Sequence, residues 1–162
     1  MQSKYVLQYY AQKGYDIEAM AKFSVNICGS HRRLGSTKND EAKAITLGEK
    51  DGKIYITGNT EGNINGQKNI GSKDAFVIKL NSKGEEIWTT LIGSKKEDEA
   101  YSITIHKDDS IYVAGLTEGT LNGQNNSGEE DAFVTKINSK GKKLWTKLIG
   151  DDGSEFASSI SM

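Results

Sequence analysis

Residues 58–92 read GNTEGNINGQKNIGSKDAFVIKLNSKGEEIWTTLI, and residues 115–149 read GLTEGTLNGQNNSGEEDAFVTKINSKGKKLWTKLI. When one stretch is set on the other at an offset of 57, 22 of the 35 positions are identical. Self-similarity at a fixed period is typical of repeat architectures, in which each repeat is one supersecondary unit. The duplication therefore predicts two copies of a single structural unit.

The repeat extends upstream of the quoted stretch. The segment GSTKNDEA at 35–42 returns as GSKKEDEA at 93–100 and, more loosely, as GDDGSEFA at 150–157. We therefore divide the chain into one complete unit, a second complete unit and the first strand of a further unit, at 35–92, 93–149 and 150–162.

Each unit contains four short stretches rich in the β-branched and aromatic residues that are enriched in strands. The expected strands are 42–47, 53–58, 74–80 and 85–92 in the first unit, and 100–105, 110–115, 131–137 and 142–149 in the second. The turn at 81–84 ends on Gly84, where a tight hairpin needs a positive φ, and Gly141 ends its copy. Four hairpin-connected strands at this period predict a β-propeller blade. The expected fold is all-β, with two full blades of four antiparallel strands and partial blades at both ends.

The first 34 residues repeat less clearly. Segment 4–12 is compatible with a short helix. Segment 14–23, GYDIEAMAKF, resembles a worn copy of SKDAFVIKL at 72–80, and segment 24–34 then occupies the place of the last strand of a blade. The expected arrangement over 1–34 is a degenerate half blade.

The composition limits the classes of partner and site that this chain can have. The 21 basic and 22 acidic residues are spread along the chain, so no basic stripe predicts a nucleic-acid partner. Cys28 has no partner for a disulfide or a CxxC site. No apolar run is long enough to cross a bilayer, and no signal-peptide core with a cleavage site is present in this sequence. We expect no cofactor and no membrane insertion.

The polar residues give little support to catalysis. The only histidines are His31 and His106, and the acidic residues recur with the repeat. A catalytic site needs unlike groups converging on one point, whereas a residue used once per repeat favours a structural role. We therefore predict no catalytic residue. Asp74 and Asp131 are expected to accept hydrogen bonds from the amides of the preceding loop.

Trp88 and Trp145 occupy the same position of the repeat. A tryptophan buries a large area, so both are expected to pack between neighbouring blades. A platform on which a sugar ring stacks is the alternative for these two side chains.

The Asn- and Gly-rich loops at 61–73 and 118–130 are the expected contact surface for a protein or glycan ligand, since loops on a rigid scaffold carry function. The candidate ligand-binding residues are Asn63, Asn65, Gln67, Asn122 and Gln124. Calcium is a further hypothesis, because segments 61–67 and 118–124 are rich in oxygen side chains, although each offers one carboxylate and neither has the aspartates of an EF-hand. Its candidate ligands are Glu61, Asn65, Glu118 and Asn122.

One order of motifs occurs in both units: IYITGNT at 54–60, DAFVIKLN at 74–81, then Gly84, Trp88 and Gly93, and one repeat later IYVAGLT at 111–117, DAFVTKIN at 131–138, Gly141, Trp145 and Gly150. This order resembles the bacterial β-propeller repeat family called SBBP repeats, over residues 35–162. The resemblance implies a propeller fold and an exported or cell-surface protein. It implies no defined activity.

A closed propeller has about 4 to 8 blades, more than this sequence holds. The expected partners are further blades from the same or another chain, and a homodimer that closes a ring is one arrangement, with a strand at 155–161 adding to the N-terminal half blade. The leading function is a non-enzymatic module that acts as a binding or scaffold surface. The alternative is part of a glycan-processing propeller enzyme, which would require non-repeated polar groups near the ring axis.

Overall fold

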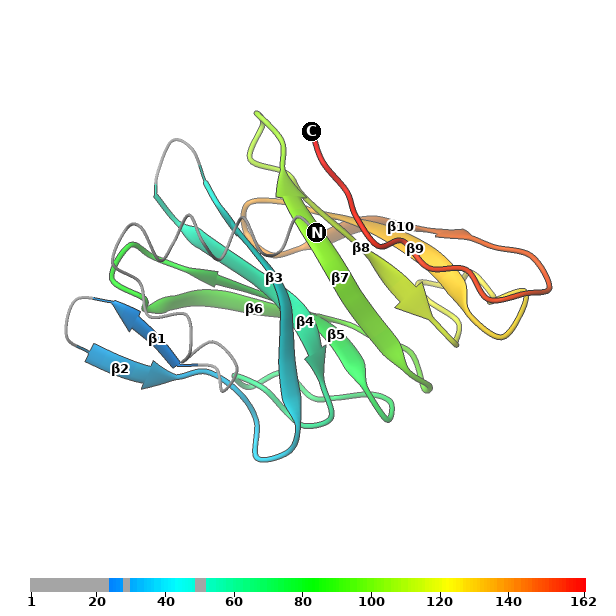
Figure 1. Ribbon diagram of the computed structural model, residues 1–162, viewed down its shortest axis with the longest axis horizontal. Coiled ribbons are helices and arrows are strands. Elements are labelled where there is room, and N and C mark those ends of the chain that lie inside the picture. Colours follow the sequence, from blue (N-terminus) through cyan, green and yellow to red (C-terminus); the bar gives the residue numbers. More distant parts are fainter. Residues whose placement is uncertain (1–23, 28–29, 49–51) are drawn as a thin grey trace.

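The computed structural model describes residues 24–27, 30–48 and 52–162. These residues form ten strands and no helix, arranged as two four-stranded antiparallel sheets and one two-stranded sheet. The two large sheets lie against each other and do not close into a ring (Figure 1). The described part of the chain is therefore all-β, as predicted.

Each large sheet corresponds to one sequence repeat, and its strands are paired in chain order. The first sheet consists of β3 (Asp40–Leu47), β4 (Ile54–Thr60), β5 (Asp74–Leu80) and β6 (Glu86–Ile92). The second consists of β7 (Asp98–Ile105), β8 (Ile111–Thr117), β9 (Asp131–Ile137) and β10 (Lys143–Ile149). Four antiparallel strands per repeat are thus confirmed, with bounds within two residues of those predicted.

The first two strands of each sheet are longer than the apolar pattern indicated. Asp40 pairs with Thr60 at the open end of β3 and β4, and the Thr60 hydroxyl donates a hydrogen bond to the Asp40 carboxylate. Asp98 and Thr117 repeat both contacts in β7 and β8. Polar side chains thus extend the ladder where the hydrophobic alternation has already ended.

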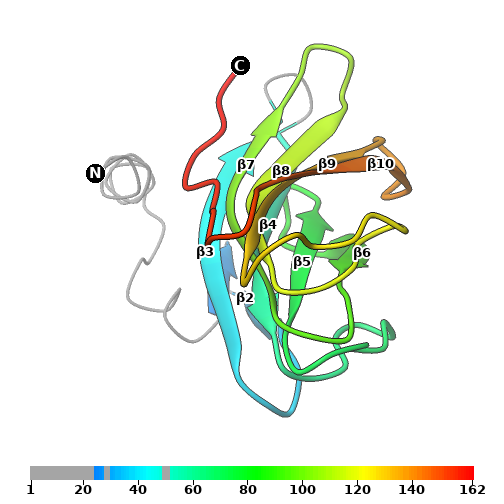
Figure 2. The same ribbon diagram turned by 90° about the vertical axis from the view of Figure 1, so that its right-hand side faces the viewer.

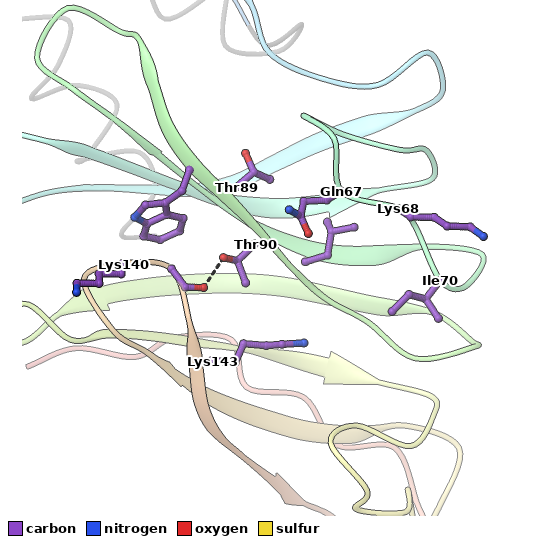
Figure 3. Close-up of a pocket in the computed structure, with 10 residues that line it drawn as sticks. Gln67, Lys68, Ile70, Thr89, Thr90, Lys140 and Lys143 are labelled. Carbon is purple, nitrogen blue, oxygen red and sulfur yellow. Dashed lines mark hydrogen bonds between the residues drawn. The ribbon is translucent and has the colours of Figure 1, made fainter.

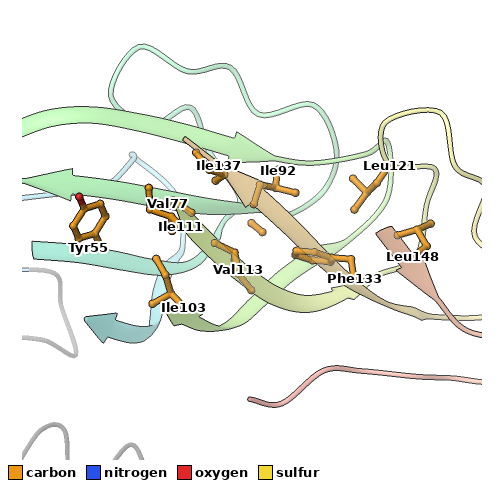
Figure 4. Packing of buried hydrophobic residues seen from close by; sticks show 12 residues of the cluster. Tyr55, Val77, Ile92, Ile103, Ile111, Val113, Leu121, Phe133, Ile137 and Leu148 are labelled. Atoms are coloured by element: carbon orange, nitrogen blue, oxygen red, sulfur yellow. The ribbon is translucent and has the colours of Figure 1, made fainter. Parts of the chain in front are cut away.

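The main core lies between the two large sheets (Figure 4). Tyr55, Val77 and Ile92 of the first sheet pack against the second sheet, which contributes Ile103, Ile111, Val113, Phe133, Ile137 and Leu148. A second cluster occupies the opposite face of the first sheet and contains Leu34, Ile54, Ile56, Phe76, Ile78 and Leu80. The second sheet therefore packs against one face of the first, in the way that repeats stack to bury a shared core.

The two ends of the chain differ from the sequence-based expectation. Residues 24–33 contain two strands, β1 (Ser24–Ile27) and β2 (Ser30–Arg33), which pair with each other, where a single strand was expected. Local pairing satisfies their backbone groups without a distant partner. The expected helix at 4–12 and the rest of the expected half blade before residue 24 lie outside the described residues.

No strand is assigned after β10, although one was expected at 155–161. The segment runs beside the second sheet instead, where the Ile160 amide donates to Ser102 Oγ of β7 at 3.1 Å (Figure 2). The strands β3 and β7 are each paired with the strand that follows them, whereas no strand of the described residues follows segment 155–161. No helix of the described residues is long and apolar enough to cross a membrane.

Candidate functional site

Three side chains of the first sheet, Tyr55, Lys79 and Trp88, form a cluster that we call the first triad. Lys79 Nζ lies 4.9 Å from the centre of the Tyr55 ring, and the rings of Tyr55 and Trp88 meet edge to face at 6.2 Å and 68°. Trp88 Nε1 and Lys79 Nζ donate to Ser139 O at 3.2 and 3.3 Å. Ser139 belongs to the turn at 138–141 between β9 and β10, so the first triad holds a turn of the second sheet.

Gly141 completes this contact. Its φ is +83°, the left-handed conformation expected for this turn, and φ at Gly84 is +76°. The Thr90 hydroxyl donates to Gly141 O at 2.7 Å, and a Cβ atom at Gly141 would lie 2.8 Å from Trp88 Cδ2. The sequence of the two turns predicted a positive φ at both glycines. It did not predict the contact between Gly141 and the indole ring of Trp88.

One repeat later, Tyr112, Lys136 and Trp145 form the second triad. Lys136 Nζ lies 5.2 Å from the centre of the Tyr112 ring, and the rings of Tyr112 and Trp145 meet at 6.0 Å and 68°. These values nearly equal those of the first triad. However, the Trp145 side chain is 44% exposed, and no turn of the described residues lies against it. The second triad therefore has the geometry of the first without its occupant.

The second triad belongs to the free face, which we define as the outer face of the second sheet formed by Tyr112, Val134, Lys136, Trp145 and Ile149. Ile149 is 56% exposed, whereas Ile92, its counterpart in the first sheet, is 1% exposed. Outside this face the two copies agree, because Leu144 and its counterpart Ile87 are 49% and 46% exposed. The exposure of the free face thus reflects the lack of a covering sheet within the described residues.

A backbone contact that we call the seam joins the two sheets, and it occurs again after β10. At the first seam the Asp98 amide donates to Lys73 O at 2.8 Å, and one repeat later the Glu155 amide donates to Glu130 O at 2.9 Å. Isolated parallel bridges accompany both contacts. The residues after β10 thus make the same backbone contact with the second sheet that residues 93–98 make with the first.

Asp74 and Asp131 accept hydrogen bonds from the loops that precede them. Ile70 N lies 2.8 Å from Asp74 Oδ2, and Ser127 N lies 3.2 Å from Asp131 Oδ2. Burial raises the pKa of the Asp74 carboxyl, and the hydrogen bonds from the Ile70 and Gly71 amides oppose that shift. Both carboxylates are buried and anchor the loop to the sheet.

Asp98 is a buried carboxylate that the sequence analysis did not single out. Ser94 N donates to Asp98 Oδ2 at 2.6 Å, and the Thr117 hydroxyl donates to Oδ1. Burial, together with the nearby charge of Asp74, raises the pKa of Asp98 to about 6. The signal that would have found it is the spacing Gly-Ser-x-x-x-Asp, which ends at Asp40 in one unit and at Asp98 in the next.

The raised pKa of Asp98 predicts a pH-dependent stability. The folded state binds the Asp98 proton more tightly than the unfolded state, in which the carboxyl has a pKa of 3.8. The resulting stabilisation of the fold is therefore complete below pH 3.8 and is lost as the pH rises through about 6. We expect the free energy of unfolding of the native chain, measured relative to Asp98→Asn, to fall by at most about 3 kcal/mol between about pH 4 and about pH 7. Urea denaturation at several pH values measures this difference, and a difference that does not change with pH would contradict it.

Most of the candidate loop residues hold the loops onto the outermost strands. Asn65 and Asn122, with φ of +49° and +48°, donate through their side chains to Thr89 Oγ1 at 2.9 Å and Thr146 Oγ1 at 2.7 Å. Gln124 donates to a backbone oxygen of β10 and accepts from the amide of Leu148. These side chains therefore hold the loops to the strands, and their role toward a ligand stays a prediction.

The calcium candidates Glu61 and Glu118 lie in different loops, between β4 and β5 and between β8 and β9. Glu61 accepts a hydrogen bond from Asn39 Nδ2 at 3.1 Å, and Asn63 accepts from the Asn69 amide at 3.0 Å. Glu118 is the counterpart of Glu61 in the other loop. Across the described residues, no three His, Cys, Asp or Glu side chains gather as a metal ion would require.

A groove of about 350 Å³ lies where the first-sheet loop, β6 and the turn at 138–141 meet (Figure 3). Gln67 is the one candidate ligand residue that lines it. The other polar lining residues include Lys68, Lys140 and Lys143, which come from both sheets.

Comparison with known proteins gives one distant relative. No family model matches the chain. The regulatory protein FlaEY of Caulobacter vibrioides is 29% identical over 144 residues, an alignment that covers 80% of this chain and 15% of that protein. The chain therefore resembles a small part of a much longer protein, and membership of the SBBP repeats stays a prediction.

Proposed function

We propose that this chain is a non-enzymatic module of the β-propeller type that serves as a scaffold, and that its free face binds a further repeat unit. The second triad is the observation that carries the proposal. It presents Trp145 and Lys136 in the geometry with which the first triad holds the turn at 138–141. A preorganised apolar and donor-bearing face of this kind is typical of an interaction surface.

The occupant is identified by what the first triad binds. That occupant is the turn Asn-Ser-Lys-Gly, and the same four residues occur at 81–84 and 138–141. Trp145 Nε1 and Lys136 Nζ would donate to the serine carbonyl of such a turn, and its glycine would lie flat against the indole ring. The partner is therefore a sheet of the same repeat, from a longer protein or from another chain.

Two further observations support the proposal. The seam after β10 already repeats the first contacts of a docking unit. The aligned part is 15% of the relative from Caulobacter vibrioides, so a segment similar to this chain lies within a longer protein. The exported or surface location implied by the family resemblance remains a prediction.

The proposal is tested by inserting a second copy of residues 93–149 between residues 149 and 150. In stacked repeats each new interface adds to the stability of its neighbours. We expect the extended chain to unfold in one transition at a higher urea concentration than the native chain. The same insertion with Trp145→Lys is the matched control and should lose the gain. Separate transitions, the first at the native midpoint, would overturn the proposal.

A further inference from the structure

The groove between the two sheets gathers positive charge. Lys68 lies in the first-sheet loop, Lys140 in the turn between β9 and β10, and Lys143 at the start of β10, and all three line the groove (Figure 3). Among the described residues, none of the three has a carboxylate within ion-pair distance. Three lysines that line one groove and form no ion pair with a described residue make its electrostatic potential positive, which favours a bound anion.

This charge arises where the two copies of the repeat differ. Lys68 stands opposite Asn125 of the second copy, and Lys143 stands opposite Glu86 of the first. Residues that are identical in both copies support the sheet that both copies form. These two lysines are not needed for that sheet, because the other copy forms it without them. Two residues that break the repeat and line the same groove indicate a site that the second copy does not share.

Lys143 is the central member of the cluster. Burial lowers its pKa, and the charges of Asp74 and Asp98 oppose that effect. The Asp98 carboxylate is engaged by Ser94 N and Thr117, and the Asp74 carboxylate by backbone amides. The two carboxylates therefore offset part of the positive charge of Lys143. Its ammonium group is partly desolvated and lies beside the groove.

We propose that this groove binds a small ligand bearing oxyanion groups, either carboxylate or phosphate. Its volume of about 350 Å³ lies within the range of small-molecule sites. Lysine is a common ligand of phosphate and carboxylate oxygens, Gln67 adds an amide, and Ile70 and Trp88 supply an apolar wall. This site is independent of the free face, since it uses the interface that the two sheets already form.

The test is isothermal titration calorimetry on the full chain with inorganic phosphate and, separately, with citrate, each at constant ionic strength adjusted with sodium chloride. Binding of phosphate and binding of citrate distinguish the two sources of the oxyanion. Lys143→Glu, which restores the residue of the other copy, is expected to weaken binding about tenfold or more. Lys68→Asn, an exposed change that also restores the other copy, is expected to weaken it about threefold.

The matched control is Lys142→Glu. Lys142 is the exposed neighbour of Lys143, its counterpart is also a glutamate, and it does not line the groove. The charge change is the same, so binding should change by less than about twofold. Saturable heat with either anion and this order of variants would support the site. No heat beyond the chloride control, or equal losses in Lys142→Glu and Lys143→Glu, would overturn it.

Discussion

Gly115→Ala is expected to lower the free energy of unfolding by about 3 kcal/mol, the upper range for overpacking a well-packed interior. Gly115 lies in β8, opposite the register shift between Ala100 and Ser102 of β7. A Cβ atom at this position would lie 1.8 Å from Glu99 O and 2.9 Å from Ala100 Cα. Both are backbone atoms in a paired strand, so neither can move without breaking the ladder.

The matched control for this change is Gly123→Ala, with both variants measured by urea denaturation. Gly123 has φ of +78°, but a Cβ atom there would have no neighbour within 4 Å. Backbone strain alone costs about 1 kcal/mol. Equal losses in the two variants would show that the close approach of β7 and β8 is not what requires glycine at position 115.

Trp88→Ala is expected to cost about 3 kcal/mol, whereas Trp145→Ala should cost less than about 1 kcal/mol. Trp88 lies between the sheets, donates to Ser139 O and contacts Gly141. Trp145 has the same neighbour within its own sheet, Tyr112, but faces solvent. The two changes remove the same atoms from the same position of the repeat, so the difference measures the contact between sheets.

Urea denaturation of the two variants and the native chain gives this difference directly. Since the intrasheet contacts are matched, each variant controls for the other. Losses of equal size would mean that the first triad contributes nothing to holding the second sheet, and the role inferred for the second triad would lose its basis.

The strands were predictable because the repeat doubles each local signal. DAFVIKL and DAFVTKI share nearly the same apolar run, and the turns that follow them end in glycine at the positive φ that the hairpin needs. Packing between neighbouring sheets was expected for both Trp88 and Trp145, because a tryptophan buries a large area. Trp88 packs in this way, whereas Trp145 is 44% exposed.

The sites were harder to predict because they depend on contacts between units. The loop residues Asn65 and Asn122 were expected to face a ligand, but a single sequence does not show that Thr89 and Thr146 lie within reach of their amides. The groove lysines come from segments more than 70 residues apart, so only the packing of the two sheets brings them together.

The central claim is that the free face is built to receive another sheet of the same repeat. The most direct measurement is iodide quenching of Trp145 fluorescence in chains whose other tryptophans are replaced by phenylalanine, with and without the inserted copy of residues 93–149. We expect the insertion to shield Trp145 and to reduce its quenching, because Trp145 would then be covered as Trp88 is. Equal quenching in the two chains would contradict it.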